Sequence, residues 1–304
     1  MNTLDFKERL SFIIPSYRSY KTIGRAISSI LAQTDQAFIE EVIVVDSSDD
    51  SATKECLKRI TDPLVKVVEL PQKTPPAEGR NIGARKALGQ ILCFIDSDVQ
   101  LSSDWIGQVI VAWSEGVRVG GGAVVIPEEQ NKNLLALGQF YLQFNEFMDT
   151  GDKRIVSFLP SCNLFCDRDV FLKAGSFPDL QAAEDVMFCL KAGEYSPVWF
   201  VPKARCFHIF REEWISFLKN QELIGKYVMI YRRLYYRLWF YKGLWPIVLL
   251  PVFVMIKLIR MISRIVKGGA GHCLRFMVSL PAFIPGMLFW MWGFFQGVLQ
   301  FDRR

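Results

Sequence analysis

Four short apolar runs in the first hundred residues constrain the fold of this 304-residue chain more than any other feature. They are LSFIIP (10–15), EVIVVD (41–46), VKVVEL (65–70) and QILCFID (90–96). Their β-branched, nearly continuous apolar composition is typical of strands that are covered on both faces. Helical stretches separate them at residues 20–33, 51–60 and 77–88. This alternation predicts an α/β fold with a doubly wound, mostly parallel sheet, which binds its ligands beyond the carboxyl ends of the strands.

The C-terminal end of the chain has a different composition. Residues 276–299 contain no charge, and at about 1.5 Å per residue they are long enough to cross a hydrocarbon layer of about 30 Å. Lys242 and Pro246 interrupt an earlier apolar run, 238–256, whose uncharged part, 243–256, has the length of an interfacial or re-entrant helix. Together the two runs predict a hydrophobic hairpin. The alternative is the buried core of a soluble protein.

Charge does not decide whether this hairpin crosses a membrane or dips in and returns. The net charge is +5, and the excess of basic residues lies beyond Lys203, beside apolar runs. The connection within the hairpin carries Lys257, Arg260, Arg264, Lys267 and Arg275. Basic residues also flank both outer ends, so no charge bias sets an orientation. The pattern favours a membrane surface as a partner, and no nucleic-acid motif supports the other partner that a basic chain suggests.

Residues 212–236 predict an amphipathic helix, with apolar residues along one side and basic residues elsewhere. The basic residues are Lys219, Lys226, Arg232, Arg233 and Arg237. Basic amphipathic helices often lie in the membrane interface, which is the interpretation we favour here. The alternative is a helix that packs on its own domain.

The sequence thus divides into three parts: an α/β domain at residues 1–210, an interfacial helix at 211–237 and a membrane-associated hairpin at 238–304. The N-terminal segment MNTLDFKERL lacks the apolar core of a signal peptide. Seven cysteines scattered through apolar runs fit free thiols in a reducing compartment better than a disulfide framework. We therefore expect the α/β domain to be cytoplasmic, on the inner (plasma) membrane.

Asp96 and Asp98 directly follow the fourth apolar run, at the edge of the sheet where a ligand is expected. In an extended chain, residues two apart project to the same side, so these carboxylates can share one binding feature. Carboxylate oxygens suit Mg²⁺ or Mn²⁺, which take further ligands from water and substrate phosphates. A solvated turn is the alternative, and the buried strand before the motif favours a binding role.

Polar residues also follow the other predicted strands. Asp46 ends the second run and can accept hydrogen bonds from a base or ribose, whereas residues 48–51 are interpreted as a cap of the next helix. Tyr17, after the first run, offers a ring for stacking on a base. Arg80, in AEGRNIGARKALG (77–89), offers a fork to a diphosphate or to a ribose-side carboxylate. The alternative for each cluster taken singly is ordinary turn chemistry.

Taken in order, these clusters resemble family 2 inverting glycosyltransferases of the GT-A fold, a Rossmann-like α/β fold. The resemblance covers roughly residues 10–210 and implies a GT-A catalytic domain followed by the C-terminal amphipathic and membrane-associated helices. The family often has Asp-Asp-Gly-Ser after its second strand, where this chain has Asp46-Ser47-Ser48-Asp49, which leaves the contact of Asp46 with base or ribose open. The matching elements are Pro15 and Tyr17, Val44-Val45-Asp46, Gly79-Arg80-Asn81-x-Gly83, Phe94-x-Asp96-x-Asp98, SCNLFCDRDVFLKAGSF (161–177), Glu184-Asp185 and His208.

The resemblance also implies a role for each matching residue. Asp46 contacts the nucleotide base, Asp96 the ribose or base side, and Asp98 the divalent metal on the diphosphate. Asp185 is the catalytic base, with a helix cap favoured by the dipole as the alternative. His208 lies beside the metal or phosphates, or is a satisfied core histidine. The nucleotide-sugar site also includes Pro15, Tyr17, Arg80 and Glu184.

The resemblance implies an inverting, metal-dependent hexosyltransferase that uses a UDP- or GDP-sugar. The chain lacks the Gln-x-x-Arg-Trp motif of processive synthases, which favours a single transfer. With the hydrophobic hairpin, this predicts transfer to a lipid-linked acceptor at the cytoplasmic membrane face, in glycan or exopolysaccharide biosynthesis. The alternatives are a polyprenyl-phosphate monosaccharide synthase and a catalytically silent, membrane-anchored scaffold that binds nucleotide.

Overall fold

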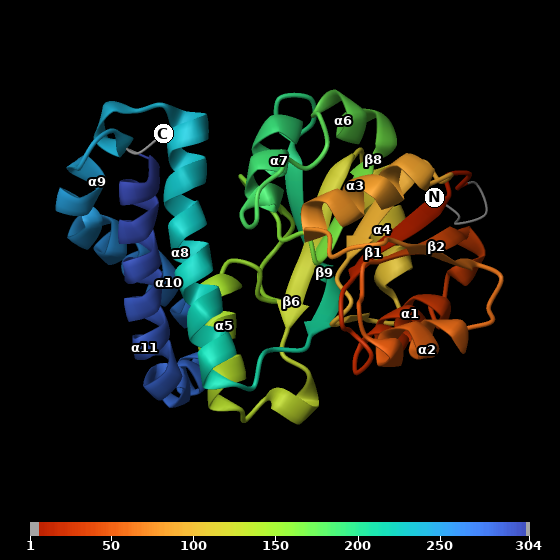
Figure 1. Cartoon of the computed structure of the whole chain (residues 1–304), viewed down its shortest axis with the longest axis horizontal. Coiled ribbons are helices and arrows are strands. Elements are labelled where there is room, and N and C mark those ends of the chain that lie inside the picture. Colours follow the sequence, from red (N-terminus) through yellow and green to blue (C-terminus); the bar gives the residue numbers. More distant parts are fainter. Residues whose placement is uncertain (1–5, 302–304) are drawn as a thin grey trace. The chain divides into compact units, whose positions relative to one another are not determined.

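The computed structural model describes residues 6–301, so residues 1–5 of the MNTLDFKERL segment and residues 302–304 lie outside it. The chain forms two compact units, both drawn in Figure 1. The sheet unit comprises Met1–Val125 and Gly151–His208, and the helical unit comprises Ile126–Thr150 and Ile209–Arg304. The structure thus groups Ile126–Thr150 with the C-terminal helices, whereas the division expected from the sequence keeps this segment in the α/β domain.

The four predicted strands form the parallel half of one sheet. They are β1 (Leu10–Ser16), β2 (Ile39–Asp46), β3 (Val65–Glu69) and β4 (Ile91–Ile95), and they lie in the order β3-β2-β1-β4. β1, β2 and β4 are largely buried, as the apolar runs predict. The expectation that both faces are covered is wrong for β3, where Lys66, Val67 and Glu69 are exposed because the strand lies at the edge of the sheet.

Beyond β4 the sheet is mixed. β8 (Asn163–Asp167) runs antiparallel to β4 and to β6 (Val119–Val125), whereas β9 (Val198–His208) is parallel to β6. The short strands β5 (Val99–Leu101) and β7 (Arg154–Ile155) pair antiparallel with β9. The fold is the expected α/β class, with its continuous parallel block in the first half. The carboxyl ends of β1, β2 and β4 therefore meet at one edge of the sheet.

The helices of the sheet unit are α1 (Ile23–Leu31), α2 (Ser51–Lys58), α3 (Pro76–Lys86), α4 (Trp105–Ser114), α6 (Arg168–Lys173) and α7 (Glu184–Ala192), with a short 3₁₀ turn, η2, at Gln36–Phe38. α3 packs on β1 and β2. A Cβ at Gly83 would lie 2.4 Å from Cγ2 of Ile13, so the close approach of this helix to the sheet requires glycine there. The close packing fixes the position of α3, which carries Arg80.

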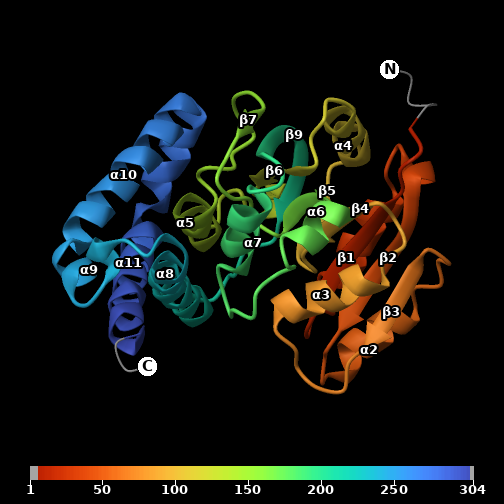
Figure 2. The same cartoon turned by 90° about the horizontal axis from the view of Figure 1, so that it is seen from above.

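The helical unit contains α5 (Leu134–Gln143), α8 (Trp214–Tyr236), α9 (Trp245–Val248), α10 (Leu250–Lys267) and α11 (Ala270–Phe301), with 3₁₀ turns η3 at Glu128–Gln130 and η4 at Trp239–Tyr241. α11 packs along α8 and α5. Figures 1 and 2 both show α8 and α11 side by side. Within the described residues, one helix, Ala270–Gln300, has the length and the apolar composition that a membrane span needs.

Two helix boundaries differ from those expected from the sequence. The charged segment 257–267, expected as a connection, is the second half of α10, because no proline or glycine interrupts it. The turn is confined to Gly268 and Gly269, and Gly269 has the left-handed φ of +92° that favours glycine. The amphipathic pattern of residues 134–148 predicts a helix that reaches Met148, whereas α5 ends at Gln143. The hairpin therefore consists of two helices joined by a very short turn.

Candidate active site

Polar side chains gather where β1, β2 and β4 end, as the sequence predicts. Asp46 is the last residue of β2 and lies opposite Ser16, the last residue of β1. Ser16 Oγ donates to Asp46 Oδ1 at 2.8 Å, and Ser48 Oγ donates to the same oxygen at 2.6 Å. Asp46 Oδ2 is buried and has no hydrogen-bond partner among the described residues. Since an unpaired buried acceptor is costly, this oxygen is available to a donor group of a ligand.

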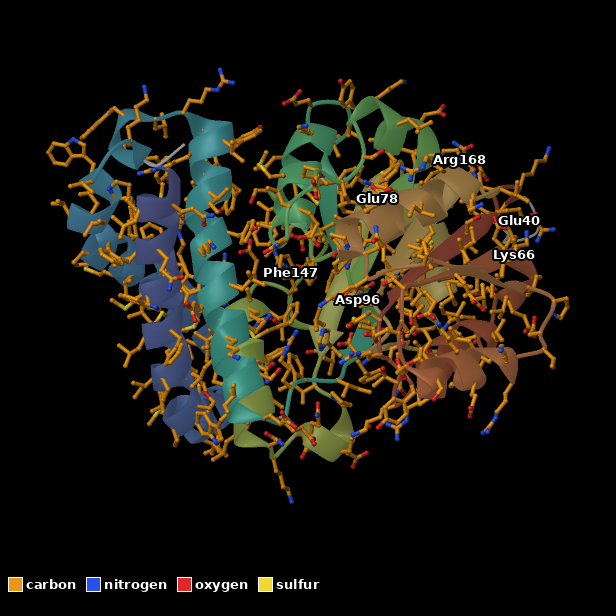
Figure 3. The ribbon with its side chains drawn as sticks, viewed as in Figure 1. Glu40, Lys66, Glu78, Asp96, Phe147 and Arg168 are labelled. Carbon is orange, nitrogen blue, oxygen red and sulfur yellow. The ribbon has the colours of Figure 1, made fainter. Side chains whose placement is uncertain are left out.

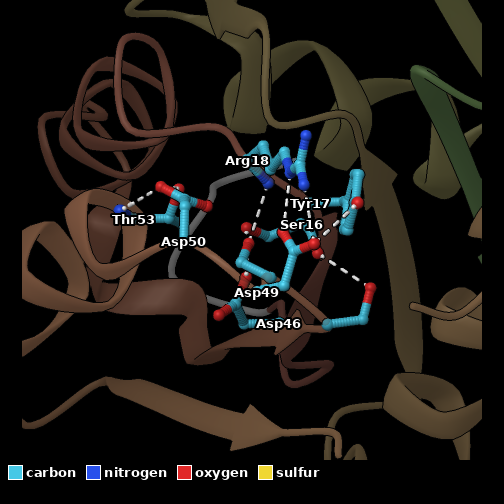
Figure 4. Close-up of polar contacts among 9 residues, drawn as sticks. Ser16, Tyr17, Arg18, Asp46, Asp49, Asp50 and Thr53 are labelled. Carbon is cyan, nitrogen blue, oxygen red and sulfur yellow. Dashed lines mark hydrogen bonds and ion pairs between the residues drawn. The ribbon is translucent and has the colours of Figure 1, made fainter. Parts of the chain in front are cut away.

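A second group of polar contacts flanks Asp46 (Figure 4). Arg18 donates to both carboxylate oxygens of Asp49, at 2.6 and 2.7 Å, and this bond lowers the pKa of Asp49 to about 2. Tyr17 donates its hydroxyl to Asp49 at 3.3 Å, and Lys73 Nζ lies 4.6 Å from the centre of the Tyr17 ring. The Tyr17 ring is thus held at the end of β1, beside the Asp46 carboxylate.

The segment 48–51 is only in part a helix cap. Asp50 Oδ2 accepts from the N–H of Thr53 at 2.8 Å and is the N-cap residue of α2. Ser48 instead bonds Asp46 and accepts from the N–H of Arg18, while Asp49 pairs with Arg18. The interpretation of the whole segment as a cap is therefore wrong for Ser48 and Asp49, because pairing of β1 with β2 brings the loop after β1 within reach of them.

Arg80, Asp96 and Glu184 form a buried ionic cluster, called the Arg80 cluster below. Arg80 Nη2 donates to Asp96 Oδ1 at 2.5 Å, and Nη1 donates to Glu184 Oε1 at 2.9 Å. The Arg80 side chain is 3% exposed. Its burial alone lowers the pKa of the guanidinium, but the carboxylates of Asp96 and Glu184 raise it above its usual range, so Arg80 stays charged. Arg80 thus pairs with a carboxylate, that of Asp96, which is one of the two kinds of partner expected for it from the sequence.

Asp185 lies beside this cluster in the first turn of α7. Its Oδ1 accepts from the N–H of Val186 at 2.8 Å, and its Oδ2 accepts from the N–H of Ser161 at 3.3 Å. Burial and the negative charge of Glu184 raise the pKa of Asp185 to about 7, although Arg80 and the two N–H groups act in the opposite direction. A carboxyl with this pKa can exchange a proton near neutral pH.

The helix-cap alternative for Asp185 applies in part. Asp185 does accept from a first-turn N–H of α7. The N-cap position belongs to Ala183, which makes no side-chain cap bond and has a left-handed φ of +62°. A left-handed alanine is strained, and such strain tends to occur at functional sites. The turn before α7 therefore fixes the positions of Glu184 and Asp185 together.

Asp96 and Asp98 do not lie in an extended chain. β4 ends at Ile95, and residues 96–99 form a turn in which the N–H of Val99 donates to the carbonyl oxygen of Asp96 at 3.2 Å. The expectation that both carboxylates project to one side of a strand is therefore wrong. Asp96 bonds Arg80, and Asp98 lies 3.8 Å from Nε2 of His208, measured from its Oδ1. The two carboxylates serve different neighbours (Asp96 is labelled in Figure 3).

Strand pairing explains how His208 reaches Asp98. His208 ends β9 and lies opposite Val99, the first residue of β5 and the neighbour of Asp98. With ion–ligand distances of about 2.0–2.1 Å, two ligand atoms 3.8 Å apart can bind one divalent ion. No group of three or more His, Cys, Asp or Glu side chains in the described part of the chain could hold a metal. A pair fits an ion that also binds substrate phosphates and water.

The remaining predicted residue, Pro15, lies in β1 opposite Val45 of β2. A Cβ at Gly79 would meet Cβ of Pro15 at 3.2 Å, so the two residues pack α3 against β1. Sequence reasoning missed Ser16, Arg18 and Lys73. Ser16 could have been found from the sequence, because it follows the first apolar run just as Asp46 ends the second. The sequence holds no signal for the long-range contacts of Arg18 and Lys73.

The sequence of the chain is similar to those of known glycosyltransferases. The sequence model of a family described as "Glycosyl transferase family 2" matches residues 11–175. The chain is 30% identical over 184 residues to Glycosyltransferase AglE of Haloferax volcanii, which covers 59% of this chain and 58% of that protein. It is 35% identical over 101 residues to Succinoglycan biosynthesis protein ExoO of Rhizobium meliloti, which covers 33% and 28%. The chain thus spans less than two thirds of either relative.

Two solved structures have a similar fold. The crystal structure of GalNAc-T7 with UDP, GalNAc and Mn²⁺ has a TM-score of 0.56 and 18% sequence identity, and covers 69% of this chain and 45% of that chain. The crystal structure of Staphylococcus aureus TarS 1-349 in complex with UDP-GlcNAc has a TM-score of 0.52 and 21% identity, and covers 71% and 65%. At these identities the likeness shows the fold and not the substrate.

Proposed function

The chain belongs to glycosyl transferase family 2, whose model matches more than half of its length, and we propose that it transfers a sugar from a nucleoside-diphosphate sugar to a lipid-linked acceptor with inversion. The observation that carries the proposal is the position of Asp185, a carboxyl with a pKa of about 7, beside the Arg80 cluster. Glycan assembly is the setting, because the similar proteins include one named for succinoglycan biosynthesis.

The cluster at the ends of β1 and β2 is proposed to hold the base of the donor. Asp46 Oδ2 is a buried acceptor without a partner among the described residues, so it fits a base that donates an N–H. Uracil and guanine both carry such a group, in agreement with a UDP- or GDP-sugar. Pro15 and Tyr17 border this position, and Asp96 lies on the ribose side. The solved structures with UDP and UDP-GlcNAc support a nucleotide-sugar donor for this fold.

Asp185 is proposed as the catalytic base. Its carboxylate takes the proton of an acceptor hydroxyl as the hydroxyl oxygen attacks the anomeric carbon. The bond from that carbon to the diphosphate oxygen breaks on the opposite face, so the configuration inverts and the nucleoside diphosphate leaves with the bonding electron pair. Glu184, next to Asp185, is bonded to Arg80, and the Arg80 cluster thereby holds the first turn of α7 in place. Asp185 in turn bonds the N–H of Ser161.

Asp98 and His208 are proposed to hold a divalent metal, Mg²⁺ or Mn²⁺. Their carboxylate oxygen and imidazole nitrogen are suitable donors, and they leave most of the coordination shell to phosphate and water. When bound, such an ion supplies charge neutralisation for the leaving diphosphate. Mn²⁺ accompanies UDP in the similar structure of GalNAc-T7, which supports an ion in this fold.

The apolar surface of the helical unit is the reason for proposing a lipid-linked acceptor. One of its helices is long and apolar enough for a membrane, and apolar residues are exposed along α10 and α11. A cytoplasmic transferase held at the membrane reaches a lipid-linked sugar while its donor stays soluble. We propose the cytoplasmic face of the inner membrane as the location of the reaction.

The test is turnover of a panel of nucleotide-sugars by the detergent-solubilised full chain with membrane lipid extract. We expect release of one nucleoside diphosphate, appearance of the sugar in the lipid fraction, and loss of both in EDTA with recovery on addition of Mn²⁺ or Mg²⁺. Product analysis separates a lipid-linked oligosaccharide from a polyprenyl-phosphate monosaccharide. Transfer to polyprenyl phosphate itself would overturn the proposed acceptor. Tight nucleotide binding without transfer to any lipid would overturn the proposed activity.

Turnover is expected to rise with pH up to about pH 7 and then level off. Because the pKa of Asp185 is raised to about 7, its carboxyl is protonated at lower pH and cannot accept the acceptor proton. The active fraction then falls about tenfold for each unit below the pKa. Initial rates at saturating donor, with donor binding measured at each pH, test this. A rate that stays constant down to about pH 5 would exclude Asp185 as a base with this pKa.

A further inference from the structure

α10 has its apolar residues on the outside. Exposed apolar side chains recur along it at helical spacing, and we call them the α10 stripe: Val252, Met255, Ile256, Ile259, Ile262 and Val266. Ile259 and Val266 keep 59% and 62% of their surface exposed. In a water-soluble helix this face is normally polar and the apolar face is buried. The α10 stripe therefore lies where a soluble protein would place charged residues.

Two charged residues of α10 point into the helical unit instead. Lys257 Nζ donates to the carbonyl oxygen of Leu142 and lies 5.0 Å from the centre of the Trp290 ring. Arg264 donates to Asn145 at 3.0 Å and to Glu146 at 2.6 Å. The helix thus turns Lys257 and Arg264 toward protein and its apolar stripe outward, as a helix that faces lipid does.

The same part of the chain is strongly basic. Between Glu222 and Asp302 it has no acidic residue and ten basic ones. These are Lys226, Arg232, Arg233, Arg237, Lys242, Lys257, Arg260, Arg264, Lys267 and Arg275. Arg260 and Lys267 are exposed next to the α10 stripe, and Lys242 is exposed just before the helix. An apolar stripe bordered by basic side chains is complementary to a leaflet that contains anionic lipids.

Exposed aromatic residues lie at the start of this region. Trp239 and Trp245 are 63% and 52% exposed and flank the turn that leads into α9 and α10. Their rings pack edge to face, 5.5 Å apart. Tryptophan is enriched at the boundary between headgroups and hydrocarbon. The segment before α10 therefore fits the depth of the headgroups, with the α10 stripe beside it (Figure 3 draws the side chains of these helices).

The packing of α11 argues against a crossing by this helix, although its length allows one. A Cβ at Gly293 would lie 1.9 Å from the carbonyl oxygen of Glu222, so α11 and α8 are in backbone contact there. Gly297 similarly approaches the carbonyl oxygen of Lys226, and Gln296 donates to Glu222 Oε1 at 2.7 Å. The partner of α11 along this stretch is a charged helix.

A crossing α11 would carry those charges of α8 into hydrocarbon. Charged side chains are disfavoured in hydrocarbon, and Glu222 and Lys226 lie alongside the C-terminal part of the apolar helix. A spanning α11 would therefore either carry charges of α8 toward the hydrocarbon or give up its contacts with α8. An in-plane position keeps these contacts and immerses only the exposed apolar side chains.

We propose that the helical unit binds one leaflet of an anionic membrane in plane, through the α10 stripe and the exposed side of α11, and does not cross it. This rests on the proposed membrane location of the transferase and specifies the surface and the topology. The exposed apolar residues of α11, which include Leu274, Leu288 and Trp292, enter the leaflet beside the α10 stripe. The bordering lysines and arginines contact anionic headgroups.

Vesicle binding by the full chain tests the surface. We expect Ile259→Glu to lower co-sedimentation with vesicles of phosphatidylcholine and phosphatidylglycerol at least about tenfold, and vesicles of phosphatidylcholine alone to bind at least about tenfold less. Leu172→Glu, which changes an equally exposed apolar residue of α6 in the sheet unit, is the matched control and is expected to bind normally. If Ile259→Glu binds the vesicles as well as the unchanged protein does, the α10 stripe is not the membrane contact. Sedimentation of the protein without vesicles shows whether the α10 stripe instead joins copies of the chain, which would also overturn the proposal.

Labelling from one side of a sealed membrane tests the topology. Ala270→Cys and Gln300→Cys place an exposed thiol at each end of α11, outside its apolar residues, in a background where Cys56 and Cys273 are serine. In inverted membrane vesicles, an impermeant maleimide is expected to label both positions equally if α11 lies in plane. Labelling of only one of the two positions would overturn the proposal.

Donor binding and sugar transfer, measured in detergent, separate a failure of this proposal from a failure of the proposed function. Ile259→Glu is expected to keep donor binding, because the substitution lies outside the sheet unit. Loss of vesicle binding with donor binding intact supports the membrane surface. Normal vesicle binding without any sugar transfer would instead count against the proposed acceptor and leave the in-plane position standing.

Discussion

Replacement of Asp185 by asparagine is expected to lower kcat about 10²- to 10⁴-fold and to leave the affinity for the nucleotide-sugar nearly unchanged. Asparagine keeps the size of the side chain, and its single amide oxygen can still accept from the N–H of Val186, but it cannot take up a proton. The substitution therefore removes the proposed chemical step at the cost of one long local hydrogen bond, that from Ser161. Initial rates and binding of the nucleoside diphosphate, measured on the full chain, give the two numbers.

A matched control separates this role from that of a helix cap. Asp169 is an exposed acidic residue in the first turn of α6, as Asp185 is in the first turn of α7, so both interact with a helix dipole. Asp169→Asn is expected to change stability by no more than about 1 kcal/mol and to leave kcat unchanged. If the two variants differ only in stability and retain similar kcat, Asp185 is a cap and the base is elsewhere.

The parts of the site that were predictable from the sequence are those that follow from strand order. Apolar runs that end in polar residues placed Asp46 and Asp96 at one edge of a parallel sheet, since consecutive parallel strands joined by helices carry their carboxyl ends together. The small residues around Arg80 indicated a close approach of α3, which Gly83 provides. The family resemblance supplied Glu184 and Asp185, which no periodicity could have connected with Arg80.

The parts that were not predictable depend on side-chain contacts between distant segments. Arg80 and Glu184 are 104 residues apart, and their bond requires the positions of both α3 and α7. The turn at 96–99 sends Asp96 and Asp98 to different neighbours, a consequence of where β5 pairs with β9. Residues 257–267 were expected to be a connection because they are charged, but they are the second half of α10. Charged residues are compatible with both a loop and a helix, and the sequence does not show which of them face protein.

Loss of the Arg80 charge is expected to have the second large effect. Arg80→Met keeps a long side chain but leaves Asp96 and Glu184 without their shared cation in a buried position. Breaking a buried ion pair by removing one partner costs about 3–5 kcal/mol, and the lower end applies because the Asp96 side chain is 29% exposed. Urea unfolding of the full chain, followed by circular dichroism, measures the loss.

The control for this variant lies on the same helix. Arg85 is 60% exposed and pairs with Glu78 at the surface of α3, so Arg85→Met is expected to change stability by less than about 0.5 kcal/mol. An equal loss in both variants would mean that the Arg80 cluster adds nothing beyond the packing of a long side chain. If Arg80→Met does not fold, Arg80→Lys is measured instead, because lysine keeps the positive charge but cannot donate to both carboxylates with the paired N–H groups of a guanidinium.

The pH profile shows whether the Arg80 cluster also acts on Asp185. The positive charge of Arg80 lowers the pKa of Asp185, so its removal is expected to raise that pKa above about 7 and to move the rise in turnover to higher pH. A purely structural Arg80 would lower stability and leave the profile of the folded fraction in place. A shifted profile, with stability reduced as well, would mean that one buried arginine both holds α7 against the donor side of the site and sets the pH at which the base is ready.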